Sequence, residues 1–156
     1  MTAPPESREI VLRKEYPDPV EDVWSAVTDS ERLGRWFGTY TGRGRPGGTV
    51  EFTVTGEADA GGEVAAPVTV TILECDAPRR LVVDIPESAE RSWRVAVDLA
   101  PHGDGTLMVF TQEVADGLDP ADISAGWRWY LDRLAASLHG TDMPQWSAYA
   151  PQRNTP

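Results

Sequence analysis

The chain has 156 residues, of which 40% are hydrophobic, and a formal net charge of −11 at pH 7. This length suits one domain with a sizeable core and is short for two ordinary domains. The acidic excess argues against nucleic acid or an anionic membrane as a partner, because binding to such polyanions depends on Lys and Arg.

The sequence shows neither a membrane span nor a secretory signal. No apolar run approaches the ~20 residues that cross a bilayer, and the N-terminal stretch MTAPPESRE lacks a basic and then apolar pattern. Cys75 is the single cysteine, so no internal disulfide is expected. We interpret it as a small structural residue of a strand, because no His lies near it in the sequence. We therefore expect a cytoplasmic protein.

The chain begins with a predicted disordered tail over residues 1–8, which are polar and rich in Pro. Alternating apolar residues over 9–16 then predict a first strand, with Ile10, Leu12 and Tyr16 on one side.

Two short helices are predicted after this strand. Asp18 is the expected cap of the first helix, and Pro19 suits its first position, where no backbone N–H is needed. The second, shorter helix opens at Asp29 or Ser30 and is expected to end at Gly38. The first strand is therefore followed by a compact helical connection.

Five more strands are predicted along the chain, over 49–56, 67–75, 79–85, 92–100 and 106–114. The glycine-rich stretch 38–48 is predicted to be a loop; it lacks the Lys-Ser/Thr ending of a phosphate loop. Residues 57–66 are predicted to connect a hairpin. Short turns between the strands imply an antiparallel meander. The side chains expected to face inward are Val50, Phe52, Val54, Val68, Val70, Ile72, Leu81, Val83, Ile85, Trp93, Val95, Val97 and Leu99. The last strand is apolar on both sides, so its periodicity does not say which side faces inward.

A long helix is predicted over 119–139, with Asp119 as its cap, Pro120 at its first position and Gly140 just past its end. At about 100° per residue its apolar side chains fall within one arc about 100° wide. They are Ile123, Trp127, Tyr130, Leu131, Leu134 and Leu138. Trp129 points about 160° away from Trp127. We predict that either the C-terminal extension, around Trp146 and Tyr149, or a second subunit covers it.

A family resemblance rests on five pieces in order: PVEDVWSAVTDSERLGRWFG, RPGGTVEF, APRRLVVDI, GDGTLMVFTQE and GWRWYLDRLAASL. Together they resemble the domain related to the C-terminal part of the activator of Hsp90 ATPase, the AHSA1-like domain of the START-like (SRPBCC, Bet v 1-like) superfamily. The resemblance covers residues 9–139 and leaves 141–156 as an extension beyond a START-like domain at 9–140. It implies an α+β helix-grip fold, in which a six-stranded curved antiparallel sheet wraps around the long C-terminal helix, with two short helices after the first strand. It also implies a cavity between sheet and helix, with Met108, Phe110 and Gln112 turned toward it.

A binding cavity needs apolar walls and a few polar groups that orient the ligand. The candidate ligand-binding residues are Trp36, Phe37, Tyr40, Trp93, Met108, Phe110, Gln112, Trp127 and Tyr130. Among them, Gln112 and the Tyr130 hydroxyl would be the polar handles. For each aromatic residue the alternative is a plain core position. Arg35, Arg43 and Arg45 are candidate contacts for an anionic head group, and the alternative is solvated loop charges.

The sequence offers no recognisable catalytic, metal or cofactor site. His102 and His139 have no ligand spacing, and Ser124 lacks the GxSxG context of a hydrolase. We predict no catalytic residue, no metal and no cofactor.

Three functions follow from these observations. The first is non-enzymatic binding of a small hydrophobic or amphipathic molecule in the cavity, by a monomer or a homodimer. The second is a polyketide cyclase or aromatase-like enzyme, which would shape and polarise a substrate there. The third is an Hsp90-type co-chaperone, which we rank last because the resemblance extends only to the C-terminal domain of the activator.

Overall fold

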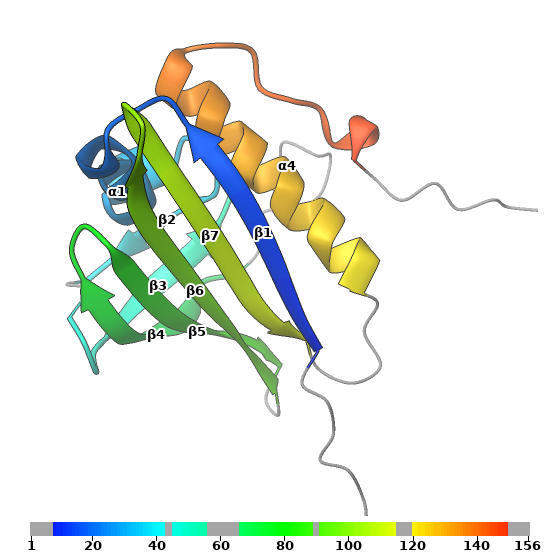
Figure 1. Ribbon diagram of the computed structural model, residues 1–156. Helices are drawn as coiled ribbons and strands as arrows, with labels where there is room; N and C mark the ends of the chain where they lie inside the picture. The colour runs from blue at the N-terminus through cyan, green and yellow to red at the C-terminus, as the bar shows by residue number, and fades with distance from the viewer. Residues whose placement is uncertain (1–7, 43–44, 56–65, 89–90, 115–119, 150–156) are drawn as a thin grey trace, which may run out of the picture.

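The structure is a computed structural model that describes residues 8–42, 45–55, 66–88, 91–114 and 120–149. A seven-stranded antiparallel sheet and a long C-terminal helix give it an α+β architecture (Figure 1). This arrangement is consistent with the expected helix-grip fold. Within the described residues, no helix combines the length and the hydropathy that a membrane span requires.

The sheet has the strand order β1-β7-β6-β5-β4-β3-β2, so β1 and β2 are its two edges. From β2 to β7 each strand pairs antiparallel with the next, as the predicted meander requires, and β1 closes onto β7. The bounds are β1 (Arg8–Tyr16), β2 (Gly38–Thr41), β3 (Thr49–Val54), β4 (Val68–Asp76), β5 (Arg80–Ser88), β6 (Arg91–His102) and β7 (Gly105–Val114).

The expectation of six strands is wrong, because β2 forms where a loop was predicted. Its residues Gly38 to Thr41 pair with β3 from Val54 to Glu51. Thr and Tyr favour strands, but the glycines that follow make the stretch look like a loop. Gly38 therefore starts a strand and does not end a helix. A Cβ atom there would lie 2.3 Å from the Thr53 carbonyl oxygen, so this edge requires a glycine.

The two short helices are α1 (Val20–Thr28) and α2 (Ser30–Leu33). Asp29 caps α2 by accepting a hydrogen bond from the Glu31 N–H at 3.0 Å, as predicted. The predicted Asp18 cap is wrong, because Pro19 is the N-cap of α1 and no side chain caps that end. The Asp18 carboxylate lies instead 2.9 Å from Nε2 of His139, the last residue of the long C-terminal helix.

The long helix α4 (Pro120–His139) has the predicted extent, and the predicted cap Asp119 lies outside the described residues. Gly140 has a φ of 66°, and the Thr141 N–H donates to the Ala136 carbonyl at 3.1 Å, so the expected left-handed ending is confirmed.

The helix α4 contacts structure near both edges of the sheet. On one side the Tyr16 hydroxyl of β1 donates to the Leu131 carbonyl at 3.0 Å. On the other side Nε of Arg133 donates at 2.8 Å to the carbonyl of Trp36, two residues before β2. The sheet and the helix therefore enclose a volume between them.

The predicted inner face is largely confirmed by burial. The buried residues of this face are Val50, Phe52, Val70, Ile72, Val95, Val97 and Leu99. On β7 the buried side chains are Thr106, Met108, Phe110, Gln112 and Val114. Burial therefore shows which side of this strand faces inward, which its sequence pattern left open. This set includes Met108, Phe110 and Gln112, the three side chains that the family resemblance turned inward.

Residues 141–149 fold back beside α4, and we call this segment the C-terminal strap (Figure 1). Trp129 is only 2% exposed, since its ring meets that of Trp146 and its Nε1 donates to the Pro144 carbonyl at 2.9 Å. Trp146 is the first residue of a short 3-10 helix, η1 (Trp146–Ala148). The prediction that the extension covers Trp129 is confirmed. Residues 1–7 of the predicted tail and 57–65 of the predicted hairpin connection lie outside the described residues.

Candidate ligand-binding cavity

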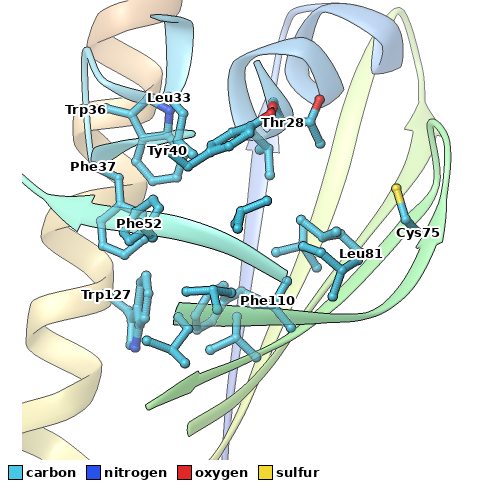
Figure 2. A pocket seen from close by; sticks show the side chains of 18 of the residues that line it. Thr28, Leu33, Trp36, Phe37, Tyr40, Phe52, Cys75, Leu81, Phe110 and Trp127 are labelled. Atoms are coloured by element: carbon cyan, nitrogen blue, oxygen red, sulfur yellow. The ribbon is translucent and has the colours of Figure 1, made fainter. Parts of the chain in front are cut away.

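A cavity of about 190 Å³ lies between the inner face of the sheet and α4 (Figure 2). Its lining comes from strands β2 to β7, from helices α1, α2 and α4, and from the turn after α2. These elements meet there because the sheet, the short helices and α4 each direct an apolar face to the same interior.

Aromatic rings fill the side of the cavity next to α4. The Phe37 ring lies 5.1 Å from that of Phe52 and 5.3 Å from that of Trp127, and Trp127 lies 4.5 Å from Phe110. In Figure 2 these rings stand on the side of α4, with Leu81 and Cys75 across the cavity from them. The wall that β4 and β5 form is aliphatic apart from Cys75.

No charged side chain is among the lining residues, which are Val27, Thr28, Leu33, Trp36, Phe37, Tyr40, Val50, Phe52, Val70, Ile72, Cys75, Leu81, Val83, Ile85, Val95, Val97, Met108, Phe110, Trp127 and Leu131. The hydrogen-bond donors of this lining are largely engaged within the protein. The Tyr40 hydroxyl donates to the Thr28 carbonyl, and the Thr28 hydroxyl donates to the Trp24 carbonyl at 2.8 Å. Nε1 of Trp36 donates to the Ala26 carbonyl at 2.9 Å. The walls suit an uncharged and mainly apolar molecule.

Burial raises the pKa of the Tyr40 hydroxyl, with smaller contributions from Asp29 and Cys75. Tyr40 is therefore protonated at neutral pH, and its hydroxyl donates a hydrogen bond to the Thr28 carbonyl. Tyr40, Thr28, Cys75 and Leu81 line the cavity and are partly exposed.

Six of the predicted ligand-binding residues line the cavity: Trp36, Phe37, Tyr40, Met108, Phe110 and Trp127. Three others, Tyr130, Gln112 and Trp93, are not among the lining residues. Tyr130 packs behind Phe37 with ring centroids 4.7 Å apart, and the side-chain oxygen of Gln112 accepts a hydrogen bond from Nε1 of Trp127. Trp93 lies on β6, two residues before the lining residue Val95.

The predicted head-group arginines do not line the cavity. Arg35 is 56% exposed and lies 3.8 Å from the Glu31 carboxylate, and Arg45 is exposed. Arg43 lies outside the described residues.

Cys75 lines the cavity, although strict alternation from Val68, Val70 and Ile72 would turn it outward. The pairing of β4 with β5 shifts register between Ile72 and Glu74, and this irregularity reverses the side on which Cys75 falls. A bulge of this kind leaves no clear signal in one sequence, so sequence reasoning missed this contact. The described residues contain no cluster of His, Cys, Asp and Glu that could hold a metal ion.

Comparison with known proteins places the chain among proteins of this fold. CalU16 from Micromonospora echinospora is 30% identical, with 85% of this chain and 76% of CalU16 covered and a TM-score of 0.70. A protein of Bordetella parapertussis encoded by BPP1335 is 25% identical, with 95% and 83% covered and a TM-score of 0.76. DynU16, from the dynemicin biosynthetic locus, is 22% identical, with 84% and 47% covered and a TM-score of 0.71, which shows the shared fold alone. No curated protein matches the chain.

The family model described as Activator of Hsp90 ATPase homolog 1-like protein matches residues 18–139. This match spans most of the sheet, the short helices and all of α4, and it includes all the residues that line the cavity. The chain therefore belongs to the activator of Hsp90 ATPase homolog 1-like family.

Proposed function

We propose that this protein binds a small, uncharged, apolar molecule in the cavity and does not transform it chemically. The observation that carries this proposal is the cavity of about 190 Å³ whose lining has no charged side chain. A site of this composition gains affinity by removing apolar surface from water.

The energetic cost of an empty cavity supports a bound molecule. At ~24 cal/mol per Å³, a volume of about 190 Å³ costs on the order of 5 kcal/mol. This is a large part of the ~5–15 kcal/mol by which domains are typically stable. A ligand that fills the cavity would recover part of the lost packing.

The volume limits the size of the ligand. A cavity of about 150 Å³ lined by aliphatic and aromatic side chains binds benzene, so a volume of about 190 Å³ suits one substituted ring or a short branched chain. Phe37, Phe110 and Trp127 supply ring faces and edges for such a ligand. A polycyclic molecule would have to displace part of this wall.

The cavity offers few ionisable groups for catalysis, and this favours binding without chemical transformation. General acid-base chemistry needs a group whose pKa lies near the working pH. The ionisable side chains among the lining residues are Tyr40 and Cys75. The pKa of Tyr40 is raised further above its ordinary value of 10.0, and its proton is held by a backbone carbonyl. For this reason we do not favour the cyclase alternative. We propose no Hsp90 partner, because no feature of the described surface selects a chaperone.

The proposal can be tested by isothermal titration calorimetry with α-methylstyrene, an uncharged single-ring probe. Val83→Phe places a ring in the cavity, because Val83 is a lining residue of β5. Val11→Phe is the matched control, because Val11 is 44% exposed on the outer face of β1. We expect wild type and Val11→Phe to bind alike and Val83→Phe to lose at least about tenfold in affinity. Equal binding by all three proteins would contradict the proposal, as would no saturable binding by wild type.

A further inference from the structure

Gln112 is a fully buried amide with only one of its two ends satisfied. It is 0% exposed, and its neighbours across the sheet are the aliphatic residues Ile10 on β1 and Val95 on β6. Nε1 of Trp127 donates to its side-chain oxygen. An indole N–H can only donate, so this contact fixes which end of the amide faces Trp127. The amide nitrogen must point elsewhere, and no acceptor in the described part of the chain reaches it.

A second buried donor lies close by. Nε1 of Trp93 is also buried without a hydrogen-bond partner, and these two are the unpaired buried side-chain polar atoms of the described residues. Val95 pairs with Gln112, and Trp93 precedes Val95 by two residues on β6. Trp93 and Gln112 therefore occupy diagonal positions on the same face of the sheet, with Cα atoms about 7–8 Å apart, a separation that large side chains can bridge.

Both donors adjoin the cavity. Trp93 pairs across the sheet with Ile85, while Gln112 pairs with Val95 and is bonded to Trp127, and these three neighbours all line the cavity. Buried donors are satisfied in more than about nine of ten cases, and an unsatisfied one destabilises the fold. Neither donor is itself a lining residue, but both lie directly behind residues that are. Two such donors on diagonal positions beside an apolar cavity indicate an acceptor that arrives from outside the chain.

We propose that Gln112 and Trp93 together recognise a hydrogen-bond acceptor on the bound molecule, which is an uncharged ketone, ester or ether. This assignment rests on the proposed function, since it concerns the same ligand. The acceptor is uncharged because amide and indole groups are neutral donors and no Lys or Arg lines the cavity, so a buried anion would have no countercharge. The hydrogen bond from Trp127 fixes the orientation of the Gln112 amide. The aromatic wall of the cavity therefore positions the donor that faces the ligand.

Two probes of the same shape test this assignment. Acetophenone carries a carbonyl where α-methylstyrene carries a C=CH₂ group, so the pair differs chiefly in the acceptor. Their affinities are to be measured for wild type, for Trp93→Phe, which removes one donor and keeps a ring, and for the control Trp24→Phe on α1, whose side chain is not among those that line the cavity. We expect Trp93→Phe to weaken acetophenone binding about 3- to 10-fold and to change α-methylstyrene binding less than about 2-fold. Trp24→Phe should leave the ratio of the two affinities unchanged.

A second measurement does not depend on any variant being stable. In proton-nitrogen correlation spectra of wild type, the Trp93 indole signal, assigned in wild type by through-bond and through-space correlations, should shift further downfield with acetophenone than with α-methylstyrene. Equal shifts and an unchanged affinity ratio would overturn the assignment while leaving the proposed function standing, because a buried water would then occupy the two donors. If neither probe binds, the proposed function itself fails.

Discussion

The indole ring of Trp129 meets that of Trp146 edge to face, with centroids 5.4 Å apart and planes inclined by 62°. The guanidinium of Arg133 lies 4.8 Å from the centre of the Trp129 ring as well. The outward side of α4 is thus covered by the C-terminal strap at Trp129, and neither Trp129 nor Trp146 is among the residues that line the cavity. A change in the C-terminal strap should therefore leave the cavity unaltered, and a change in the cavity should leave the strap unaltered.

Removal of residues 141–156 should expose Trp129 and leave ligand binding intact. The loss of packing on one large side chain should cost about 1.5–3 kcal/mol in the free energy of unfolding. Acrylamide quenching of tryptophan emission should increase, and the affinity for α-methylstyrene should stay within about twofold. Trp146→Ala in the full chain is the milder control. Unaltered quenching after both changes would contradict the role of the strap.

The Tyr149 hydroxyl donates to the Asp132 carboxylate at 2.6 Å, a contact that should fail in alkali. Burial, followed by this hydrogen bond and the charge of Asp132, raises the pKa of Tyr149 to about 12 from its ordinary 10.0. Below pH 10 the hydroxyl is protonated in both folded and unfolded chains, so its contribution to stability is complete. Between pH 10 and about 12 the unfolded chain loses this proton first, and the contribution decreases.

Tyr149→Phe measures this contribution. The difference in unfolding free energy between wild type and Tyr149→Phe, from urea unfolding, should be constant up to pH 10 and shrink as the pH approaches 12. Comparison of the two proteins cancels the effect of Tyr16, whose pKa burial also raises. A difference that does not change through pH 11.5 would show that the contact does not stabilise the folded strap.

Trp127→Ala should destabilise the protein by about 3–5 kcal/mol, because the ring is 7% exposed and packs between Phe110 and Phe37. The change also leaves the Gln112 oxygen without its donor. Trp24→Ala, at a partly exposed position of α1, should cost less. Thermal and urea unfolding of both variants measure the difference. A cost near 1 kcal/mol for Trp127→Ala would indicate that its ring lines an open, water-filled space.

The arginine prediction concerns a ligand with an acidic group. If a head group extends from the cavity to the solvent, Arg35→Gln and Arg45→Gln together should weaken benzoate more than acetophenone. Both side chains are exposed, so the effect on benzoate should decrease as salt is added. Calorimetry at low and high ionic strength measures it. Equal effects on the two probes would leave these arginines as solvated surface charges.

The sequence predicts most of the fold because its patterns are local. Alternation in β3, the arc of α4 and the left-handed Gly140 all reflect backbone periodicity that one element determines by itself. The edge strand β2 was missed because four residues between a helical turn and a glycine-rich stretch show too little alternation. Its pairing with β3 is a tertiary contact, which overrides the local loop signal.

The candidate site was predicted less completely, for a related reason. Residues such as Phe37 and Trp127 are bulky and lie in periodic elements, so they were identified as walls. Cys75 was missed because a bulge in β4 decides its direction. The unpaired state of the Gln112 and Trp93 donors depends on what surrounds them in three dimensions, which no spacing in the sequence encodes.

The most direct test of the central claim is native mass spectrometry of the protein purified from its own host under non-denaturing conditions, with Val83→Phe prepared in parallel. We expect wild type to carry an uncharged small molecule that is released on denaturation, and Val83→Phe to carry none. A bare wild-type mass, or the same adduct on Val83→Phe, would contradict binding in the cavity.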